Sequence, residues 1–269
     1  MGTLDFAIMA AFAWMALFLI MTFAWAVQQK TGNSGWVDVS WTFGTGGVAF
    51  IASVAPSGAD PWPLWRQIAV AALTACWCLR LGLHIASRTR AIADDPRYRQ
   101  LINEWGEDAA RRMFWFLQSQ AAVGALLALS IGLAARNPDP ALRIQDIVGI
   151  VILLGAIVGE TVADRQLLRF TSNPANKNAV CDVGLWRWSR HPNYFFEWLS
   201  WTSYPLIAID LAGHHPYGWL SVGAPVCMFW VLVHVSGIPP LEAHMLRSRG
   251  DAFRAYQKRT RPFIPLPKF

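Results

Sequence analysis

The chain has 269 residues, of which 54% are hydrophobic and only 15% are charged, and its mean hydropathy is +0.31. A typical soluble domain is about 45–50% apolar and about 25% charged. These values argue against a soluble globular enzyme, a disordered chain and a disulfide scaffold, and they indicate a polytopic membrane protein. The net charge of +6 is typical of basic cytoplasmic loops, so we expect membrane lipids as partners and no nucleic acid.

Seven stretches are apolar and long enough to be read as membrane-crossing helices, which take about 20 residues. They are Phe6–Gln29, Val39–Ala59, Leu64–Ile85, Met113–Ala135, Ile147–Asp164, Tyr194–Ala212 and Trp219–Ser236. No internal repeat or long linker separates them, so we expect an all-α fold in a single membrane domain over residues 1–269. Between the third and fourth stretches, Asp94-Asp95-Pro96 predicts the start of an interfacial helix.

Lysine and arginine are distributed unevenly between the loops. Segments 28–35, 86–112, 165–192 and 242–269 carry one, six, five and seven of these residues, whereas the opposite side carries only Arg66, Arg136 and Arg143. Seven spans place the four basic segments on one side. The positive-inside rule then predicts an outside N-terminus and a cytoplasmic C-terminus, in a membrane that we take to be the bacterial inner membrane.

Glycines within the apolar stretches favour close packing of helices. Gly44-Thr45-Gly46-Gly47 follows no strand, so it does not have the context of a dinucleotide-binding loop. We expect Gly155 and Gly159 to serve packing as well. The four cysteines form no CxxC pair, and we expect no metal site.

Ionisable residues inside the spans are concentrated toward the predicted cytoplasmic ends. Insertion of such a group costs about 2.5–3.5 kcal/mol, so these residues tend to be functional. They are Asp38, Arg80, His84, Arg88, Glu160, Asp164, Glu197 and His234. Structural alternatives stay open: Arg80 could pair with Glu160 or Asp38, Asp38 could cap its helix, and the histidines could be interior polar groups. Convergence from several spans favours a polar cavity open to the cytosol.

The most informative motif, GLWRWSRHPNYFFEW, runs from Gly184 to Trp198. Pro192 suits the first turn of a helix, which would place Asn193 and Glu197 on one face. Arg190 and His191 directly precede this helix N-terminus, where an anion binds favourably. A phosphorylated cofactor or a carboxylate is the ligand that this pattern favours, and an ordinary cytoplasmic loop that binds lipid headgroups is the alternative.

These residues resemble the C-terminal signature of the steroid 5-alpha-reductase-like membrane proteins, and more closely their bacterial DUF1295 branch. The resemblance covers most of residues 36–267. It includes Asp38-Val39-Ser40-Trp41, Leu79–His84, Glu160-x-x-x-Asp164-Arg165-Gln166, Tyr256-Gln257-x-Arg259-Thr260 and Phe263-Ile264-Pro265. Sterol reductases and isoprenylcysteine methyltransferases carry related RHPxY stretches, so the motif is more specific for the superfamily than for a reaction.

The resemblance implies a seven-helix fold with NADPH in a cytosol-facing cavity. By position, Asn193 and Glu197 would contact the nicotinamide side and Glu160 and Asp164 the adenosine half. Basic residues near them, together with His191, would complete the cofactor site; they are Arg88, Arg169 and Arg190. Carboxylates accept hydrogen bonds from ribose hydroxyls and arginines match phosphate oxygens, so these roles are chemically reasonable.

The sequence departs from the steroid reductases at the catalytic tyrosine, because Ile85 occupies the equivalent position. The second span also lacks their Gln-Glu pair, and Asp38 is its nearest acid. Candidates for the proton donor are therefore Asp38, His84 and Tyr194, while Arg80 could stabilise a developing enolate.

The sequence is interpreted as a membrane-embedded, NADPH-dependent reductase of a carbon–carbon double bond in a lipid-like substrate. A methyltransferase that uses S-adenosylmethionine is the first alternative, although Leu241-Glu242-Ala243-His244 offers one glutamate where that type has a pair. A non-catalytic lipid-binding protein is the second, and Ile85 is its best support.

Overall fold

The computed structural model describes residues 1–55, 64–91 and 94–267, and these form helices and no β-strand. Their contacts group them into two compact units. Unit 1 comprises Met1–Gly149 and Tyr204–Ala224, and unit 2 comprises Ile150–Ser203 and Pro225–Phe269. Each unit combines two separated segments of the chain. That the whole chain is one domain stays a prediction.

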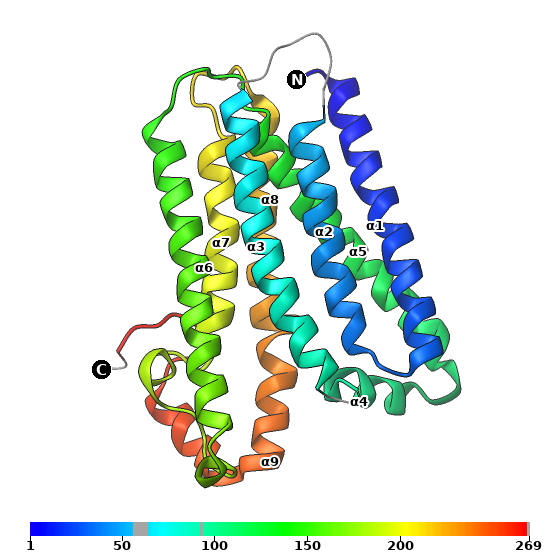
Figure 1. Cartoon of the computed structure of the whole chain (residues 1–269), viewed down its shortest axis with the longest axis vertical. Coiled ribbons are helices and arrows are strands. Elements are labelled where there is room, and N and C mark those ends of the chain that lie inside the picture. Colours follow the sequence, from blue (N-terminus) through cyan, green and yellow to red (C-terminus); the bar gives the residue numbers. More distant parts are fainter. Residues whose placement is uncertain (56–63, 92–93, 268–269) are drawn as a thin grey trace. The chain divides into compact units, whose positions relative to one another are not determined.

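Unit 1 is built mainly from long helices that follow one another along the chain (Figure 1). They are α1 (Thr3–Thr31), α2 (Gly35–Val54), α3 (Leu64–Arg90), α4 (Pro96–Trp105) and α5 (Ala109–Ala135), with a short 3-10 turn at Gly106–Asp108. Helix α2 packs against α1, α3 and α5. Residues 56–59 of the expected second span lie outside the described residues.

Close helix packing is confirmed at Gly44 and Gly46 of α2, whereas at Gly47 an added Cβ would meet no described atom within 4 Å and the expectation is wrong. A Cβ atom at Gly46 would lie 2.3 Å from the Cys78 sulfur on α3, and one at Gly44 would lie 2.8 Å from Ile20 on α1. Both distances are shorter than real Cβ contacts, so only glycine allows these approaches. The same expectation is wrong for Gly155, where an added Cβ would meet no described atom within 4 Å.

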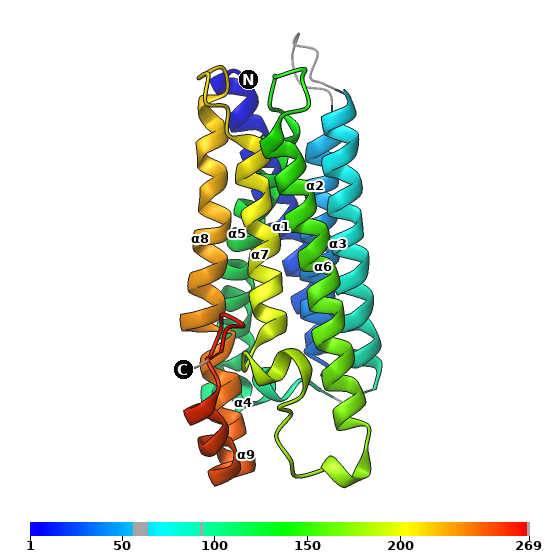
Figure 2. The same ribbon diagram turned by 90° about the vertical axis from the view of Figure 1, so that its left-hand side faces the viewer.

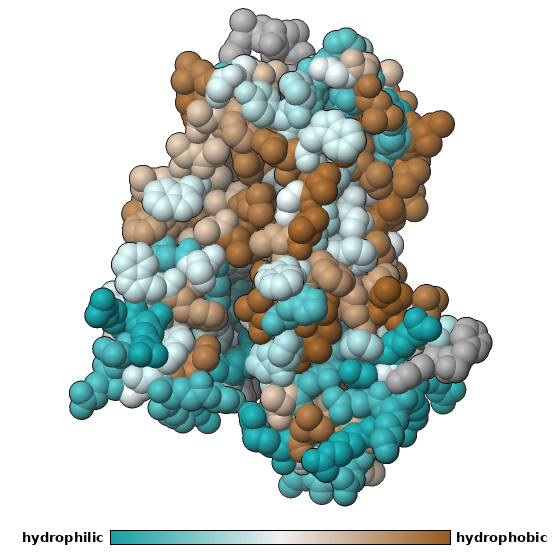
Figure 3. Space-filling model, turned by 180° about the vertical axis from the view of Figure 1, so that it is seen from behind, coloured by the Kyte–Doolittle hydropathy of each residue, from teal (hydrophilic) through white to brown (hydrophobic). Residues whose placement is uncertain are grey.

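Unit 2 contains most of α6 (Ile144–Thr171) and of α7 (Pro192–Ala208), which run side by side in Figures 1 and 2. Its second segment contains most of α8 (Gly223–Trp230), a π-helical turn (Val231–Val235) and α9 (Ile238–Arg259). On the face that Figure 3 shows, teal hydrophilic side chains gather toward the lower edge, and brown hydrophobic side chains are frequent in the middle of the view. This pattern fits a protein whose middle is surrounded by hydrocarbon.

An all-α polytopic fold is therefore confirmed. Six helical stretches are long and apolar enough to cross a membrane in the described part of the chain. The remaining expected span, Tyr194–Ala212, coincides with α7, which has 17 residues, slightly fewer than the usual length. The helix start expected at Asp95-Pro96 is confirmed as that of α4: the Asp95 side chain accepts a hydrogen bond from the Arg97 backbone N–H, and Pro96 occupies the first turn. That α4 is interfacial stays a prediction.

The three basic residues expected on the sparsely charged side hold unit 1 together. Arg66 is fully buried and lies 2.9 Å from the Asp146 carboxylate; its guanidinium also donates to the carbonyls of Asn137, Asp139 and Ala141. Arg143 lies 2.8 Å from the other oxygen of Asp146.

Arg143 also donates to the backbone carbonyls of Ile207 and Ile209, at 2.6 and 2.8 Å. Arg136 donates to the carbonyls of Ala52 and Ala55. These carbonyls lie at or near helix ends, where intrahelical partners run out. The few arginines of this side are therefore used in internal contacts.

We expect Arg66→Met to lower the free energy of unfolding by about 3 kcal/mol, because it removes one of the two guanidinium partners of the buried Asp146 carboxylate and the donor to three backbone carbonyls. Arg254→Met is the matched control. Its partner Asp251 is exposed, so its loss should cost less than about 1 kcal/mol. Denaturant titration in mixed micelles measures both. Equal effects of the two substitutions would contradict a structural role for the Arg66 contacts.

Candidate functional site

Four polar side chains of the sequence motifs occupy neighbouring turns of α6 and α7 in unit 2. Glu160 and Asp164 are one turn apart on α6, and Asn193 and Glu197 are one turn apart on α7. The Asn193 side-chain amide donates to the Asp164 carboxylate at 3.3 Å, which ties the two helices together. Glu160 and Glu197 are buried, with 4% and 7% of their surface exposed. The structure thus brings this predicted set together; we call these four residues the α6–α7 polar face.

Close packing keeps this polar face narrow. A Cβ atom at Gly159 would lie 2.4 Å from the Phe196 ring, so glycine is needed for α6 to approach α7 here, as predicted. One turn further along α6, the Ala163 carbonyl accepts a hydrogen bond from the Trp186 indole at 2.9 Å. The Glu197 carboxylate accepts one from the Trp201 indole at 3.0 Å. The Glu197 carboxylate is therefore oriented by its own helix before any ligand binds.

The loop before α7 is held by the C-terminal segment. The Ser189 hydroxyl donates to the Phe263 carbonyl at 2.7 Å, and the Arg190 backbone N–H donates to the Arg261 carbonyl at 2.9 Å. The buried Tyr256 hydroxyl donates to the carbonyls of Trp186 and Ser189. The α7 N-terminus is thus positioned by residues about 70 positions later in the sequence.

Glu242 on α9 is the acidic partner of the Arg190-His191 pair. Its carboxylate accepts two hydrogen bonds from the Arg190 guanidinium, at 2.7 and 3.2 Å, and lies 2.9 Å from His191 Nε2. The Gln257 amide donates a further hydrogen bond at 2.7 Å. Arg190 also donates to the carbonyls of Gln257 and Thr260. We call this set, Glu242 with Arg190, His191 and Gln257, the Glu242 cluster.

The Glu242 cluster gives the Arg190 and His191 side chains a structural use. The side chains of Arg190 and His191 are only 10% and 3% exposed, and both are directed to Glu242. The sequence predicted an anion site here because Arg190 and His191 directly precede a helix N-terminus. Their partner Glu242 lies about 50 residues later in the chain, so the sequence did not reveal the pairing. Their contacts with Glu242 favour positioning of α7 over direct contact with a cofactor phosphate.

Other candidates from the sequence lie near these groups. The Tyr194 ring stacks on the His191 ring, with centroids 5.6 Å apart and an interplanar angle of 12°. Arg169 is exposed near the end of α6, five positions after Asp164, and is available to an anion from solvent. His234 lies in the π-helical turn, with its ring centroid 4.9 Å from that of Trp230.

Asp38 belongs to a separate ionic cluster in unit 1. Its carboxylate lies 2.5 Å from the Arg97 guanidinium and accepts a hydrogen bond from the Tyr98 hydroxyl at 2.7 Å. Arg97 also pairs with Asp95 at 2.9 Å, and Arg88 lies 3.5 Å from the same residue. Burial alone would raise the pKa of Asp95, but hydrogen bonds and charge from Arg97, with the charge of Arg88, bring that pKa below its ordinary value.

These contacts join the ends of α2, α3 and α4 on one side of unit 1. Asp38 therefore has two donors, Arg97 and Tyr98, neither of which the sequence had singled out. Arg80 and His84 lie one turn apart on α3, and both are partly buried. Ile85 follows them on the same helix.

The sequence did not predict four side chains that contact these groups. They are Arg97 and Tyr98, which contact Asp38, and Tyr256 and Gln257, which contact the loop before α7 and Glu242. Arg97 and Tyr98 lie on the amphipathic α4, where a basic residue reads as an ordinary surface group. Tyr256 and Gln257 were visible within the signature, but their partners are distant in sequence. Glu242 was weighed only as half of an absent glutamate pair. A charged residue near a membrane needs a partner, and that is the signal that could have singled it out.

We expect Glu242→Gln to loosen the C-terminal segment. The substitution keeps the side-chain size but leaves Arg190 without its counter-charge, so the contacts at residues 260–263 should weaken. Amide hydrogen exchange in that segment should accelerate, and the melting temperature should fall. Asp251→Asn, on an exposed position of the same helix, is the control and should change neither.

The buried His191 imidazole predicts a dependence of stability on pH. Burial lowers its pKa below the ordinary value of 6.5, partly opposed by the Glu242 carboxylate and reinforced by the Arg190 charge. Its contribution is thus complete above pH 6.5 and is lost as the pH falls through the lowered folded-state pKa, because the unfolded chain takes up the proton first. The melting temperature should fall between pH 7.5 and pH 5.5.

The variant His191→Gln should show a smaller fall over the same interval. Part of the fall in melting temperature should remain in this variant. Burial lowers the pKa of His215 in unit 1 to about 4, so protonation of His215 at low pH also destabilises the folded state. An unchanged pH dependence in His191→Gln would assign the effect to other groups.

Comparison with known proteins gives one match. The model of the DUF1295 family, described as a protein of unknown function, matches residues 24–260. No curated protein and no solved structure matches the chain. The match spans most of the chain and includes both the α6–α7 polar face and the Glu242 cluster. The chain therefore belongs to the DUF1295 family.

Proposed function

We propose that the protein is a membrane-embedded reductase that uses NADPH to reduce a polarised carbon–carbon double bond in a lipid-like substrate. The observation that carries the proposal is the α6–α7 polar face. Helices α6 and α7 bring the Asp164 carboxylate and the Asn193 carboxamide together through a hydrogen bond, and the Glu160 and Glu197 carboxylates each lie one turn away on these helices. Insertion of ionisable groups into a membrane segment costs free energy, which favours a function for these residues.

The chemistry of this set fits NADPH. Glu160 and Asp164 are acceptors suited to ribose hydroxyls, and Asn193 and Glu197 offer a donor and an acceptor for a carboxamide. Arg169, exposed beyond Asp164 on the same helix, is suited to a phosphate group. Arg88 belongs to unit 1, where its half-exposed side chain lies 3.5 Å from Asp95, and its contact with the cofactor phosphates stays a prediction from the resemblance. Arg190 and His191 would act indirectly, by fixing the N-terminus of α7.

When bound, NADPH would supply a hydride to the electron-poor carbon of the double bond. The protein must hold the cofactor and substrate in register, exclude water and deliver a proton to the adjacent carbon. Asp38 accepts hydrogen bonds from two donors, so its contacts favour a structural role over that of the acid. His84 and Tyr194 remain the proposed acids, and Arg80 is suited to stabilise a developing enolate.

The substrate would enter from the bilayer, where an apolar molecule is concentrated. By the positive-inside rule, the basic ends of the helices would face the cytoplasm, where NADPH is available. A bacterial inner membrane is the location that we propose.

We expect NADPH to raise the melting temperature of the detergent-purified protein. A ligand at 100 times its dissociation constant stabilises a folded protein by about 2.7 kcal/mol. Asn193→Ala and Glu197→Ala should abolish the increase while leaving a folded protein. Asp251→Asn should retain it. Thermal melts with NADPH, NADH and S-adenosylmethionine, each against all four proteins, make the measurement.

Each ligand response separates the candidates. Unchanged NADPH affinity in both Asn193→Ala and Glu197→Ala would remove the nicotinamide-side assignment. A response to S-adenosylmethionine alone would replace reduction by methyl transfer. No response to any of the three would favour a non-catalytic lipid-binding protein.

A further inference from the structure

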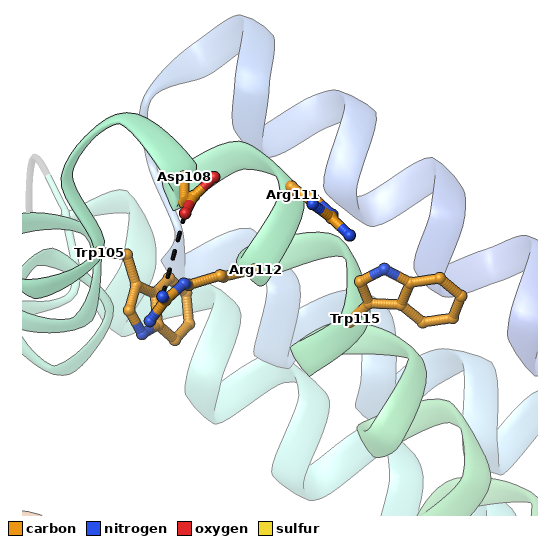
Figure 4. Close-up of a pocket in the computed structure, with 5 residues that line it drawn as sticks. All are labelled: Trp105, Asp108, Arg111, Arg112 and Trp115. Carbon is orange, nitrogen blue, oxygen red and sulfur yellow. Dashed lines mark ion pairs between the residues drawn. The ribbon is translucent and has the colours of Figure 1, made fainter.

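An open groove lies on unit 1 where α4 ends and α5 begins, away from the residues assigned to the reaction. Its volume is about 520 Å³, and it is lined by Trp105, Asp108, Arg111, Arg112 and Trp115. Figure 4 shows the two arginines on the α5 ribbon, with Trp105 beside Arg112 and Trp115 on the side of Arg111. The groove thus combines two cations with two large amphipathic rings.

The charge of the groove is incompletely balanced. Arg112 and Asp108 are 4.0 Å apart, and both side chains are more than half exposed. An ion pair of this kind contributes little, about 0–1 kcal/mol. Arg111 forms no ion pair with any residue in the ranges 1–55, 64–91 and 94–267. An anion at this position would therefore meet one unpaired guanidinium and a second that is only weakly engaged.

The groove lies at the level where α5 enters its apolar stretch. Met113 and Leu117 are completely buried in the helix packing, whereas Trp115 between them is 63% exposed. The Trp25 indole on α1 donates to the Ala110 carbonyl at 3.0 Å, which places the end of α1 beside the groove. Tryptophan is enriched at the height of the lipid headgroups, and arginine there reaches the phosphates.

The neighbouring surface is suited to acyl chains. Phe18 on α1 packs edge-on against Phe114 on α5, with ring centroids 6.3 Å apart, and Trp14, one turn before Phe18, is 48% exposed. Phe114 on α5 packs edge-on against Trp25, with ring centroids 5.6 Å apart. A molecule with an anionic head in the groove would thus find a row of aromatic side chains from α1 and α5 that continues from it. A free phosphate or a nucleotide would make no use of that surface.

We propose that this groove is a binding site for one anionic phospholipid, with its headgroup phosphate between Arg111 and Arg112 and its glycerol region between the Trp105 and Trp115 rings. Arginine forks match phosphate oxygens in geometry, and the indoles tolerate a surface that is half wet and half apolar. The site would fix the height of α4 and α5 in the membrane. It does not depend on the reductase proposal.

Native mass spectrometry of the full-length, delipidated protein in detergent provides the test, with phosphatidylglycerol and phosphatidylcholine added in separate titrations. Wild-type protein should bind phosphatidylglycerol at least tenfold more tightly than phosphatidylcholine. The double variant Arg111→Gln/Arg112→Gln should lose this preference. Arg111→Lys/Arg112→Lys should retain part of it, because the charge remains but the forked geometry does not.

Arg90→Gln/Arg254→Gln removes the same two charges from exposed positions elsewhere and should bind as the wild type does. An equal loss in this control would show diffuse charge attraction and overturn the site. Retained preference in Arg111→Gln/Arg112→Gln would overturn it as well. Complete displacement of phosphatidylglycerol by millimolar inorganic phosphate would identify a free-phosphate site instead of a lipid site. A melting curve for each variant confirms that it is folded.

Discussion

Hydrocarbon offers no hydrogen-bond partner, so each charged or polar group that this chain brings near the membrane interior needs a partner within the protein. The two clearest cases are Arg66 with Asp146 in unit 1 and Arg190 with Glu242 in unit 2. In each, one guanidinium joins a carboxylate to the backbone carbonyls of a distant segment. The planar shape and the five donors of arginine make this possible, and lysine could not replace it.

This requirement explains why the RHPN stretch is so dense in polar residues. Arg190 and His191 hold the start of α7 against α9 through Glu242, and Asn193 then reaches α6 through Asp164. Adjacent residues of one motif thus do two different tasks: the first pair positions the helix, and the amide lies in the candidate site. The sequence of this motif predicts one continuous anion site, but the fold assigns its first two residues to the Glu242 cluster and Asn193 to the α6–α7 polar face.

The division also affects how the departure at Ile85 is understood. A side chain with no proton to give occupies the position of the tyrosine, and Asp38 is engaged by Arg97 and Tyr98. Any reductase chemistry in this protein must therefore take its proton from another group than in the steroid enzymes that it resembles. The α6–α7 polar face, by contrast, contains the groups that the resemblance implies for the cofactor.

Several features of the fold were predictable because they depend on short stretches of chain. Apolar runs fixed the spanning helices to within a few residues at most ends, Asp95 and Pro96 located the start of α4, and the glycines of α2 indicated close packing. Helical spacing put Asn193 and Glu197 on one face of α7. The sequence did not predict where α7 ends or that a π-helical turn precedes α9. Both lie within apolar stretches, and apolar periodicity does not mark such irregularities.

By itself, then, the sequence determined an all-α membrane protein, the residues of the α6–α7 polar face and the family to which the chain is related, since composition, periodicity and motif are properties of neighbouring residues. Only the tertiary structure decided which charges are partners. Glu242 is 52 positions from Arg190, Arg97 is 59 from Asp38, and Asp146 is 80 from Arg66. Such pairs are selected by the packing of helices, and one sequence contains many arginines and carboxylates that could have met instead.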